Sequence, residues 1–369
     1  MTTLCEVGKA NLIVYATHKP IEGFIVGTKV LTQDGYKNIE NILVNDKLLT
    51  RGIVKNILKL RTSVYNGDVY NVYIKNHPNV ITCTKEQLFY VREKKCITIN
   101  NNPEIIFKNP VWKKANNLTT NDYYGMVINR NRIIPEFTFK NPYNFDKITI
   151  KLDKKEYWFI MGYFTGDGWL DETNRLDSRN GIRFGVKNNE DENEKLGFIN
   201  NVIPLKNVHT INRRCKVFGS CDFLWYSIFE MFGKNMQAKT IPEWVQDAPI
   251  EFIHEFINGY IKSIGFINEN ECNFISTVSY NVALALQRLY LKLGHIFSVS
   301  KPTLTAVCGK TVCTYCINGN KDDTSFIEYD YVWYEPFHIS KIKAIDTPVY
   351  DFKIENGHSY VVENKIICN

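Results

Sequence analysis

Two apolar segments of this sequence, residues 158–169 and 256–266, share a spacing of small residues that constrains the fold more than any other feature. In each segment two small residues lie four positions apart: Gly162 with Gly166, and Gly259 with Ser263. Four-residue spacing places both on one face of a helix, where another backbone can approach closely. Glycine inside a helix costs about 1 kcal/mol relative to alanine, so a repeated pair requires a packing reason. We therefore predict two helices that cross at close range, an arrangement that an ordinary α/β domain could also contain.

The sequence changes character twice along its 369 residues. Residues 23–135 have the short apolar runs and turn residues of β-strands, and residues 148–320 alternate helical with strand patterns. Residues 330–369 return to β character. The pattern predicts an α+β multidomain protein in which a β domain is interrupted by an α/β domain and then completed. Residues 1–22 match neither part and are expected to be a leader or the remnant of a host segment.

Within this outline, residues 48–60 and 69–74 are predicted to form separate strands. Two segments rich in Asn and charge, 129–146 and 318–325, are the expected domain junctions.

The paired small-residue segments resemble the LAGLIDADG motifs of DOD-type homing endonucleases, whose helices form the interface between two similar halves. Two more segments match in the family's order: residues 239–244 resemble its K-x-I-P element, and residues 276–294 resemble the helix that follows the second motif. The resemblance implies a pseudo-two-fold αββαββα domain over residues 148–320. It also implies a monomer that binds double-stranded DNA and cleaves it with Mg²⁺.

In this family the acid at the end of each motif helix binds a divalent cation beside the scissile phosphates, where the metal activates water and neutralises charge. Asp167 stands at the first acid position, and Ile264 stands at the second. An isoleucine cannot coordinate Mg²⁺, so we expect cleavage of both strands to be impaired. Nicking through Asp167 alone, DNA binding without catalysis, and a decayed element with no selected role are the alternatives.

The family's strands form a saddle that contacts DNA through basic and polar side chains. A net charge of +6 is compatible with a nucleic-acid partner. Each basic residue on the expected strands and turns could equally be a solvated surface charge. The candidates are Arg183, Lys187, Arg213, Arg214, Lys216, Lys301 and Lys310.

The flanking β zones resemble the Hint (hedgehog/intein) domain of inteins, the protein-splicing elements. Residues 23–35 are similar to its opening, residues 80–91 to its second block and residues 349–369 to its last two blocks. The resemblance implies a fold in which an all-β Hint domain, in two parts at 23–135 and 330–369, is split by the endonuclease domain.

At the N-terminal splice junction, the resemblance assigns a role to three positions. The first residue is normally a Cys or Ser nucleophile, and here it is Gly23. The second block normally supplies a threonine that polarises the scissile amide, present as Thr84, and a histidine, replaced by Gln87. Glutamine cannot act as a general acid. We therefore expect self-splicing to be lost.

At the C-terminal junction, the terminal asparagine that cyclises is present as Asn369. The histidine that usually precedes it is replaced by Cys368, and His358 matches a histidine that could assist cyclisation. Since the sequence stops at Asn369, we expect at most the C-terminal step, and only in a longer chain.

Other classes of protein are less compatible with the sequence. No apolar run reaches the roughly 18 residues of a membrane span, and the first 22 residues lack a secretory signal, which favours an intracellular protein in cytoplasm or nucleus. Cys308, Cys313 and Cys316 could suggest zinc, but residues three apart on a strand face opposite sides of the sheet.

Overall fold

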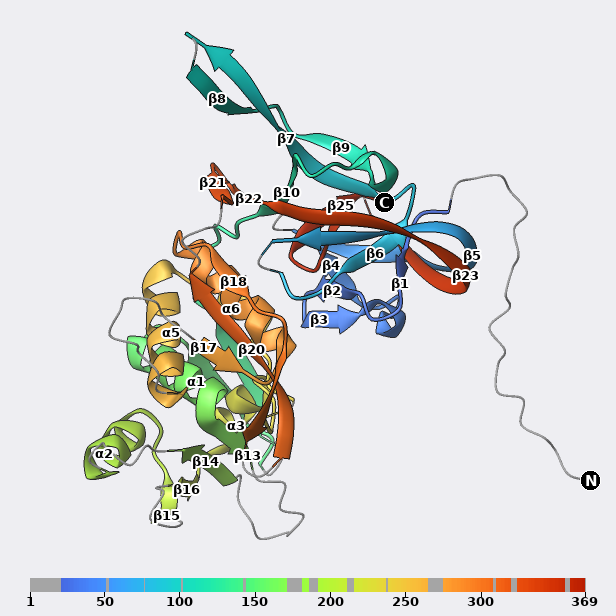
Figure 1. Ribbon diagram of the computed structural model, residues 1–369. Helices are drawn as coiled ribbons and strands as arrows, with labels where there is room; N and C mark the ends of the chain where they lie inside the picture. The colour runs from blue at the N-terminus through green and yellow to red at the C-terminus, as the bar shows by residue number, and fades with distance from the viewer. Residues whose placement is uncertain are drawn as a thin grey trace, which may run out of the picture.

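The computed structural model describes residues 21–50, 53–75, 77–100, 102–141, 144–170, 181–185, 192–210, 216–236, 238–264, 275–307, 310–319, 324–355 and 359–368 (Figure 1). The described chain is mostly β, with a group of α-helices between Lys155 and Lys292. None of its described helices is both long and apolar enough to cross a membrane.

Strands from both ends of the chain form the β part. The N-terminal ones are β1 (Phe24–Ile25), β2 (Lys29–Thr32), β3 (Gly35–Asn38), β4 (Lys47–Leu49), β5 (Val54–Ile74), β6 (Ile81–Thr84), β7 (Leu88–Ile99), β8 (Asn102–Phe107), β9 (Val111–Lys114) and β10 (Asp122–Val127). The C-terminal ones are β21 (Phe326–Glu328), β22 (Tyr331–Tyr334), β23 (Pro336–Ile354), β24 (Ser359–Val362) and β25 (Lys365–Cys368). Two short 3₁₀ helices lie at Ile39–Asn41 and Ala115–Asn117.

These strands pair into one sheet in the order β21-β22-β10-β7-β25-β24-β2-β4-β5-β23-β1-β6. Outside this order, β3 pairs with β2, and β8 and β9 pair with β7. Strand β5 pairs antiparallel with β23 along most of its length, and β10 pairs with β22. Segments from before and after the α/β part therefore complete one sheet, whose buried face includes Phe24, Phe89 and Phe352.

Strand β5 corrects one prediction from the sequence. Residues 48–60 and 69–74 were expected to be separate strands, but β5 runs unbroken from Val54 to Ile74. The register against β23 shifts between Ala344 and Thr347, and the Asn66 amide donates to the Asp346 carboxylate at 3.1 Å. A β-bulge in the partner strand, β23, therefore lies opposite Asn66.

The α/β part contains six helices among the described residues: α1 (Lys155–Asp167), α2 (Glu192–Val202), α3 (Phe223–Glu230), α4 (Glu243–Gln246), α5 (Ile250–Ile264) and α6 (Tyr280–Lys292). One sheet contains β13 (Gly168–Leu170), β14 (Gly181–Gly185), β15 (Lys206–Thr210) and β16 (Lys216–Ser220). The other contains β17 (Ile275–Thr277), β18 (Phe297–Val299), β19 (Thr303–Val307) and β20 (Lys310–Gly319). A hairpin of β11 (Glu136–Lys140) and β12 (Lys147–Lys151) precedes α1, and β11 lies within residues 129–146, one of the segments expected to be a junction.

Helices α1 and α5 cross with their backbones in contact, which confirms the prediction from the small-residue spacing. A Cβ added to Gly162 would lie 1.9 Å from the Phe256 carbonyl oxygen, and one added to Gly259 would lie 1.9 Å from the Phe159 carbonyl oxygen. The two contacts are equivalent, because each residue of α1 corresponds to the residue 97 positions later in α5. The same offset relates Asp167, the last residue of α1, to Ile264, the last residue of α5.

Candidate functional site

The first candidate site lies where α1 ends. Asp167 is exposed, and Gly168 directly after it ends the helix. A Cβ on Gly185 of β14 would lie 1.9 Å from Asp167 Oδ2, so the carboxylate packs against a strand backbone that has no side chain there. The Tyr163 hydroxyl donates to the Gly185 carbonyl at 2.8 Å. The helix end and the neighbouring strand together position the carboxylate.

Lys239 belongs to the same site, although no role was predicted for it. It is 5% exposed, and its Nζ donates to the Phe164 carbonyl oxygen at 2.7 Å. Burial lowers the Lys239 pKa well below its usual value, against the opposing effect of the Asp167 charge. A lysine whose charged form is disfavoured by burial releases its proton more readily than an exposed lysine. The only signal in the sequence was the K-x-I-P resemblance, which does not reveal burial.

The equivalent end of α5 differs. Ile264 is its last residue, and Ser263, the counterpart of Gly166, is 1% exposed and donates its hydroxyl to the Tyr260 carbonyl at 2.7 Å. Of the two related positions, one therefore carries a carboxylate and the other an alkyl side chain.

The donor set at this site limits the metal that it could hold. Among the described residues no cluster of three or more His, Cys, Asp or Glu side chains could enclose an ion. Mg²⁺ often binds through one or two carboxylates while its other ligands are phosphate oxygens and water. Asp167 fits an ion shared with a phosphate, and does not fit an ion enclosed by protein alone.

The predicted basic residues fall on both sheets of the α/β part. Arg183, on β14, is half-buried, with its guanidinium 6.0 Å from the Trp169 ring centroid. Lys216 begins β16, opposite Gly185, and Lys310 begins β20. Lys301 is exposed between β18 and β19. Lys187, Arg213 and Arg214 lie outside the described residues.

The second candidate site surrounds Gly23 in the β part. Its carbonyl oxygen accepts a 3.0 Å hydrogen bond from the backbone N–H of Thr84. Its φ is +148°, and an added Cβ would lie 2.7 Å from the Tyr350 carbonyl oxygen. The backbone at this position is therefore suited to glycine, and a side chain could enter only if the chain shifted.

Two buried polar groups lie close to Gly23. Thr84 is 0% exposed, and its hydroxyl has no hydrogen-bond partner among the described residues. Asp351 follows Tyr350, which pairs with Phe24. The Asp351 Oδ2 atom lies 3.4 Å from Arg61 Nη1. Burial raises the Asp351 pKa to about 7 although Arg61 opposes the shift. Asp351 lies in a block that resembles the Hint pattern, but its burial could not be predicted from that resemblance.

The C-terminal strand reaches the same region. Gln87 is buried in the turn between β6 and β7, where its N–H donates to the Thr84 carbonyl at 3.2 Å. Cys368 of β25 pairs with Leu88, the next residue along. Residues 84–88 therefore border both Gly23 and the C-terminal strand. His358 and Asn369 lie outside the described residues.

No protein-family model matches the chain, and no curated protein sequence does. Among solved structures, the chain is similar to I-DmoI in complex with DNA and Mn, with 13% identity and a TM-score of 0.30 over 45% of this chain and 89% of that one. It is similar to an intein-like domain from Clostridium thermocellum (20% identity, TM-score 0.19, 26% of this chain and 80% of that one). A third similar structure is the gp41-1 intein (19% identity, TM-score 0.18, 26% of this chain and 86% of that one). TM-scores this low do not establish a shared fold.

Proposed function

We propose that this chain is an intein-derived protein of the homing-endonuclease type whose α/β part binds double-stranded DNA. In this proposal metal-dependent phosphodiester cleavage is impaired, because only one of the two related helix ends carries a carboxylate. The observation that supports it best is the equivalent pair of glycine contacts between α1 and α5. That symmetry makes Asp167 and Ile264 counterparts.

At the α1 end, Asp167 is the residue that would bind a divalent cation together with a DNA phosphate. When bound, the cation would activate water and neutralise charge on the leaving oxygen. Lys239, buried behind it, would give or take a proton at its Nζ. At the α5 end Ile264 offers no ligand, so the second strand would stay intact.

DNA would lie across the two sheets of the α/β part. The basic residues assigned to phosphate contact there are Arg183, Lys187, Arg213, Arg214, Lys216, Lys301 and Lys310. Both halves of the α/β part belong to one chain, so a monomer is sufficient to bind the DNA.

Self-splicing is lost in this proposal. Gly23 supplies no nucleophile and Gln87 no general acid, while Thr84, His358 and Asn369 are the splicing residues still present. The Gly23 backbone supports this part of the proposal, since it excludes the side chain that the reaction requires.

A second candidate function is sequence-specific DNA binding without catalysis. It is favoured by Ile264, because a binder needs the basic strands and not the second carboxylate. A functional binder should keep its sequence preference at moderate salt, whereas non-specific charge attraction weakens steeply.

The test compares the unmodified protein, Ile264→Asp and Asp167→Asn. Each is incubated with a randomised duplex library in Mg²⁺ and in Mn²⁺, and the ends of nicked and broken strands are sequenced. We expect at most nicks from the unmodified protein, breaks of both strands from Ile264→Asp, and no product from Asp167→Asn. Breaks of both strands from the unmodified protein would contradict the proposed role of position 264. If no variant cleaves, enrichment of bound sequences at two salt concentrations distinguishes a specific binder from a decayed element.

A further inference from the structure

The turn of the C-terminal hairpin is buried, which is unusual for such a turn. Glu363 and Asn364 connect β24 to β25, and Val362 pairs with Lys365. Both turn residues have positive φ, 48° and 58°, as two-residue hairpin turns require. Turns usually lie at the surface, yet here the two residues are 2% and 0% exposed.

Helix α6 of the α/β part supplies hydrogen-bond partners for this turn. The Tyr280 hydroxyl donates to Glu363 Oε2 at 2.7 Å, and the Asn364 amide donates to Gln287 Oε1 at 2.7 Å. The same amide lies 3.4 Å from the Leu284 carbonyl oxygen. Tyr280, Leu284 and Gln287 lie on one face of α6, so the turn packs along that face.

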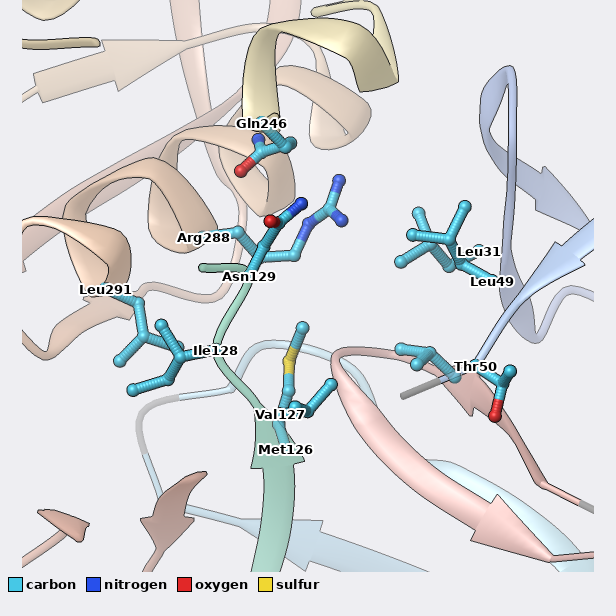
Figure 2. Close-up of a pocket in the computed structure, with 11 residues that line it drawn as sticks. Leu31, Leu49, Thr50, Met126, Val127, Ile128, Asn129, Gln246, Arg288 and Leu291 are labelled. Atoms are coloured by element: carbon cyan, nitrogen blue, oxygen red, sulfur yellow. The ribbon is translucent and has the colours of Figure 1, made fainter. Parts of the chain in front are cut away.

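The same helix also belongs to both hydrophobic cores. Leu284 and Leu291 are in the core of the β part, whereas Leu286 and Leu289 are in the core of the α/β part. A cavity of about 20 Å³ between the parts is lined by Leu31 and other residues of the β part and by residues of the α/β part (Figure 2). A cavity of that size holds roughly one water molecule. Residues of both parts therefore line the same small cavity.

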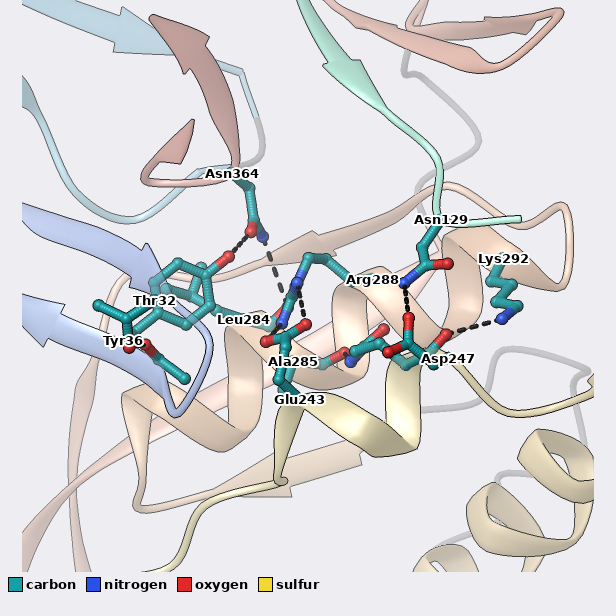
Figure 3. Close-up of polar contacts among 12 residues, drawn as sticks. Thr32, Tyr36, Asn129, Glu243, Asp247, Leu284, Ala285, Arg288, Lys292 and Asn364 are labelled. Atoms are coloured by element: carbon teal, nitrogen blue, oxygen red, sulfur yellow. Dashed lines mark hydrogen bonds and ion pairs between the residues drawn. The ribbon is translucent and has the colours of Figure 1, made fainter. Parts of the chain in front are cut away.

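Buried polar groups complete this contact. Arg288 of α6 forms a two-bond ion pair with Glu243 of α4, at 2.6 and 2.7 Å. The Arg288 guanidinium lies 5.3 Å from the ring centroid of Tyr36 on β3. The Tyr36 hydroxyl donates to the side-chain oxygen of Asn364 (Figure 3). Separation of the two parts would expose the buried Arg288–Glu243 pair and would deprive Glu363 and Asn364 of their partners on α6, which is costly.

We propose that helix α6 fixes the C-terminal hairpin in place, so that the α/β part is a structural component of the β part and not a separable insert. The hairpin carries β25, which ends at Cys368, the partner of Leu88. Helix α6 also packs against α5, so the same helix contacts the core of the α/β part and the C-terminal hairpin. This inference does not depend on DNA binding.

Hydrogen exchange of the full chain, followed by mass spectrometry, tests the proposal with Tyr280→Phe and Asn364→Gly. The first removes only the hydroxyl that bonds Glu363 and keeps the ring that packs on Tyr315. The second keeps a residue that tolerates positive φ and removes the amide that contacts α6. Tyr157→Phe in α1 is the matched control, because no hydrogen bond of its hydroxyl is present among the described contacts.

In Tyr280→Phe we expect amides of residues 359–368 to exchange about tenfold faster, the effect of losing one buried hydrogen bond to a charged group. In Asn364→Gly we expect faster exchange in residues 280–292 as well, since coupling between two elements is reciprocal. Tyr157→Phe should change neither segment. Unchanged exchange of residues 359–368 in Tyr280→Phe, or of residues 280–292 in Asn364→Gly, would overturn the proposal.

Discussion

At the scale of single residues, the backbone of Gly23 opposes the addition of a side chain. The φ of +148° and the 2.7 Å approach of an added Cβ to the Tyr350 carbonyl both oppose substitution. We expect Gly23→Cys to lower the free energy of unfolding by about 1 to 3 kcal/mol and not to restore thioester formation. Urea denaturation measures the first effect, and release of the N-terminal segment by dithiothreitol measures the second.

Gly197→Cys is the control, because an added Cβ there has nothing within 4 Å. Thiol-dependent release from Gly23→Cys, with unchanged stability, would show that the backbone relaxes and that the missing nucleophile alone accounts for the loss of splicing.

Asp351 should make the stability of the protein depend on pH. Its folded pKa of about 7 lies above the ordinary value of 3.8, so the folded state binds the proton more tightly than the unfolded state. The resulting stabilisation is complete below about pH 4 and is lost as the pH rises to about 7. It amounts to up to about 4 kcal/mol.

Asp351→Asn should remove most of this slope and unfold at a higher urea concentration than the unmodified protein at pH 8. Equilibrium urea denaturation at intervals from pH 4 to 8 tests this. A variant with the same slope as the unmodified protein would show that Asp351 does not titrate in this range. Glu363, whose pKa burial also raises, contributes a slope of the same sign that Asp351→Asn leaves in place.

At the scale of elements, the α1–α5 crossing should tolerate no side chain at either glycine. Gly162→Ala and Gly259→Ala each place a methyl group 1.9 Å from a carbonyl oxygen of the other helix. We expect each to lower the free energy of unfolding by about 3 kcal/mol, because the two backbones must separate. Equal effects within about 1 kcal/mol would reflect the symmetry of the crossing. Equilibrium denaturation measures both.

Gly197→Ala in α2 is the matched control. With open space around it, the alanine should stabilise the helix by about 0.5 to 1 kcal/mol. If Gly162→Ala behaved like this control, the close crossing would be wrong.

The elements differ in how far the sequence could predict them. Spacing alone predicted the α1–α5 crossing, because two small residues one helical turn apart, repeated in two apolar runs, weaken both helices unless their backbones pack together. The continuity of β5 across Asn66 could not be predicted, since the bulge that accommodates it lies in β23, near Asp346. For the same reason the burial of Lys239 and Asp351, which depends on distant segments, could not be predicted from local pattern.

At the scale of the whole molecule, DNA affinity should depend on the basic residues of the α/β part. Lys216→Ala and Lys310→Ala should each weaken binding at every sequence and reduce the slope of log affinity against log salt by about 1. Lys341→Ala, on β23 in the β part, is the control. Fluorescence anisotropy with labelled duplexes over a salt series measures the slopes. Equal slopes of log affinity against log salt for all three variants would show that the DNA does not bind at Lys216 and Lys310.

The order of β, α/β and β zones could be predicted from the sequence because pattern changes mark it. The domain boundaries stay predictions. The partner of each strand could not be predicted, because a register between segments so far apart leaves no local signal. The role of α6 in both cores was not predicted for a related reason. A helix that is buried on every side has the sequence pattern of a helix in the core of a single domain.

The pairing of β5 with β23 also has a consequence in time. About 260 residues separate the end of β5 from the start of its partner. At synthesis rates of roughly 5 to 20 residues per second, β5 waits on the order of 10 to 50 seconds for that partner to leave the ribosome. During this interval a long strand edge is open to wrong partners. The α/β part precedes β23 in the chain, so it can fold in the meantime and present α6 to the β24–β25 hairpin, which is synthesised later.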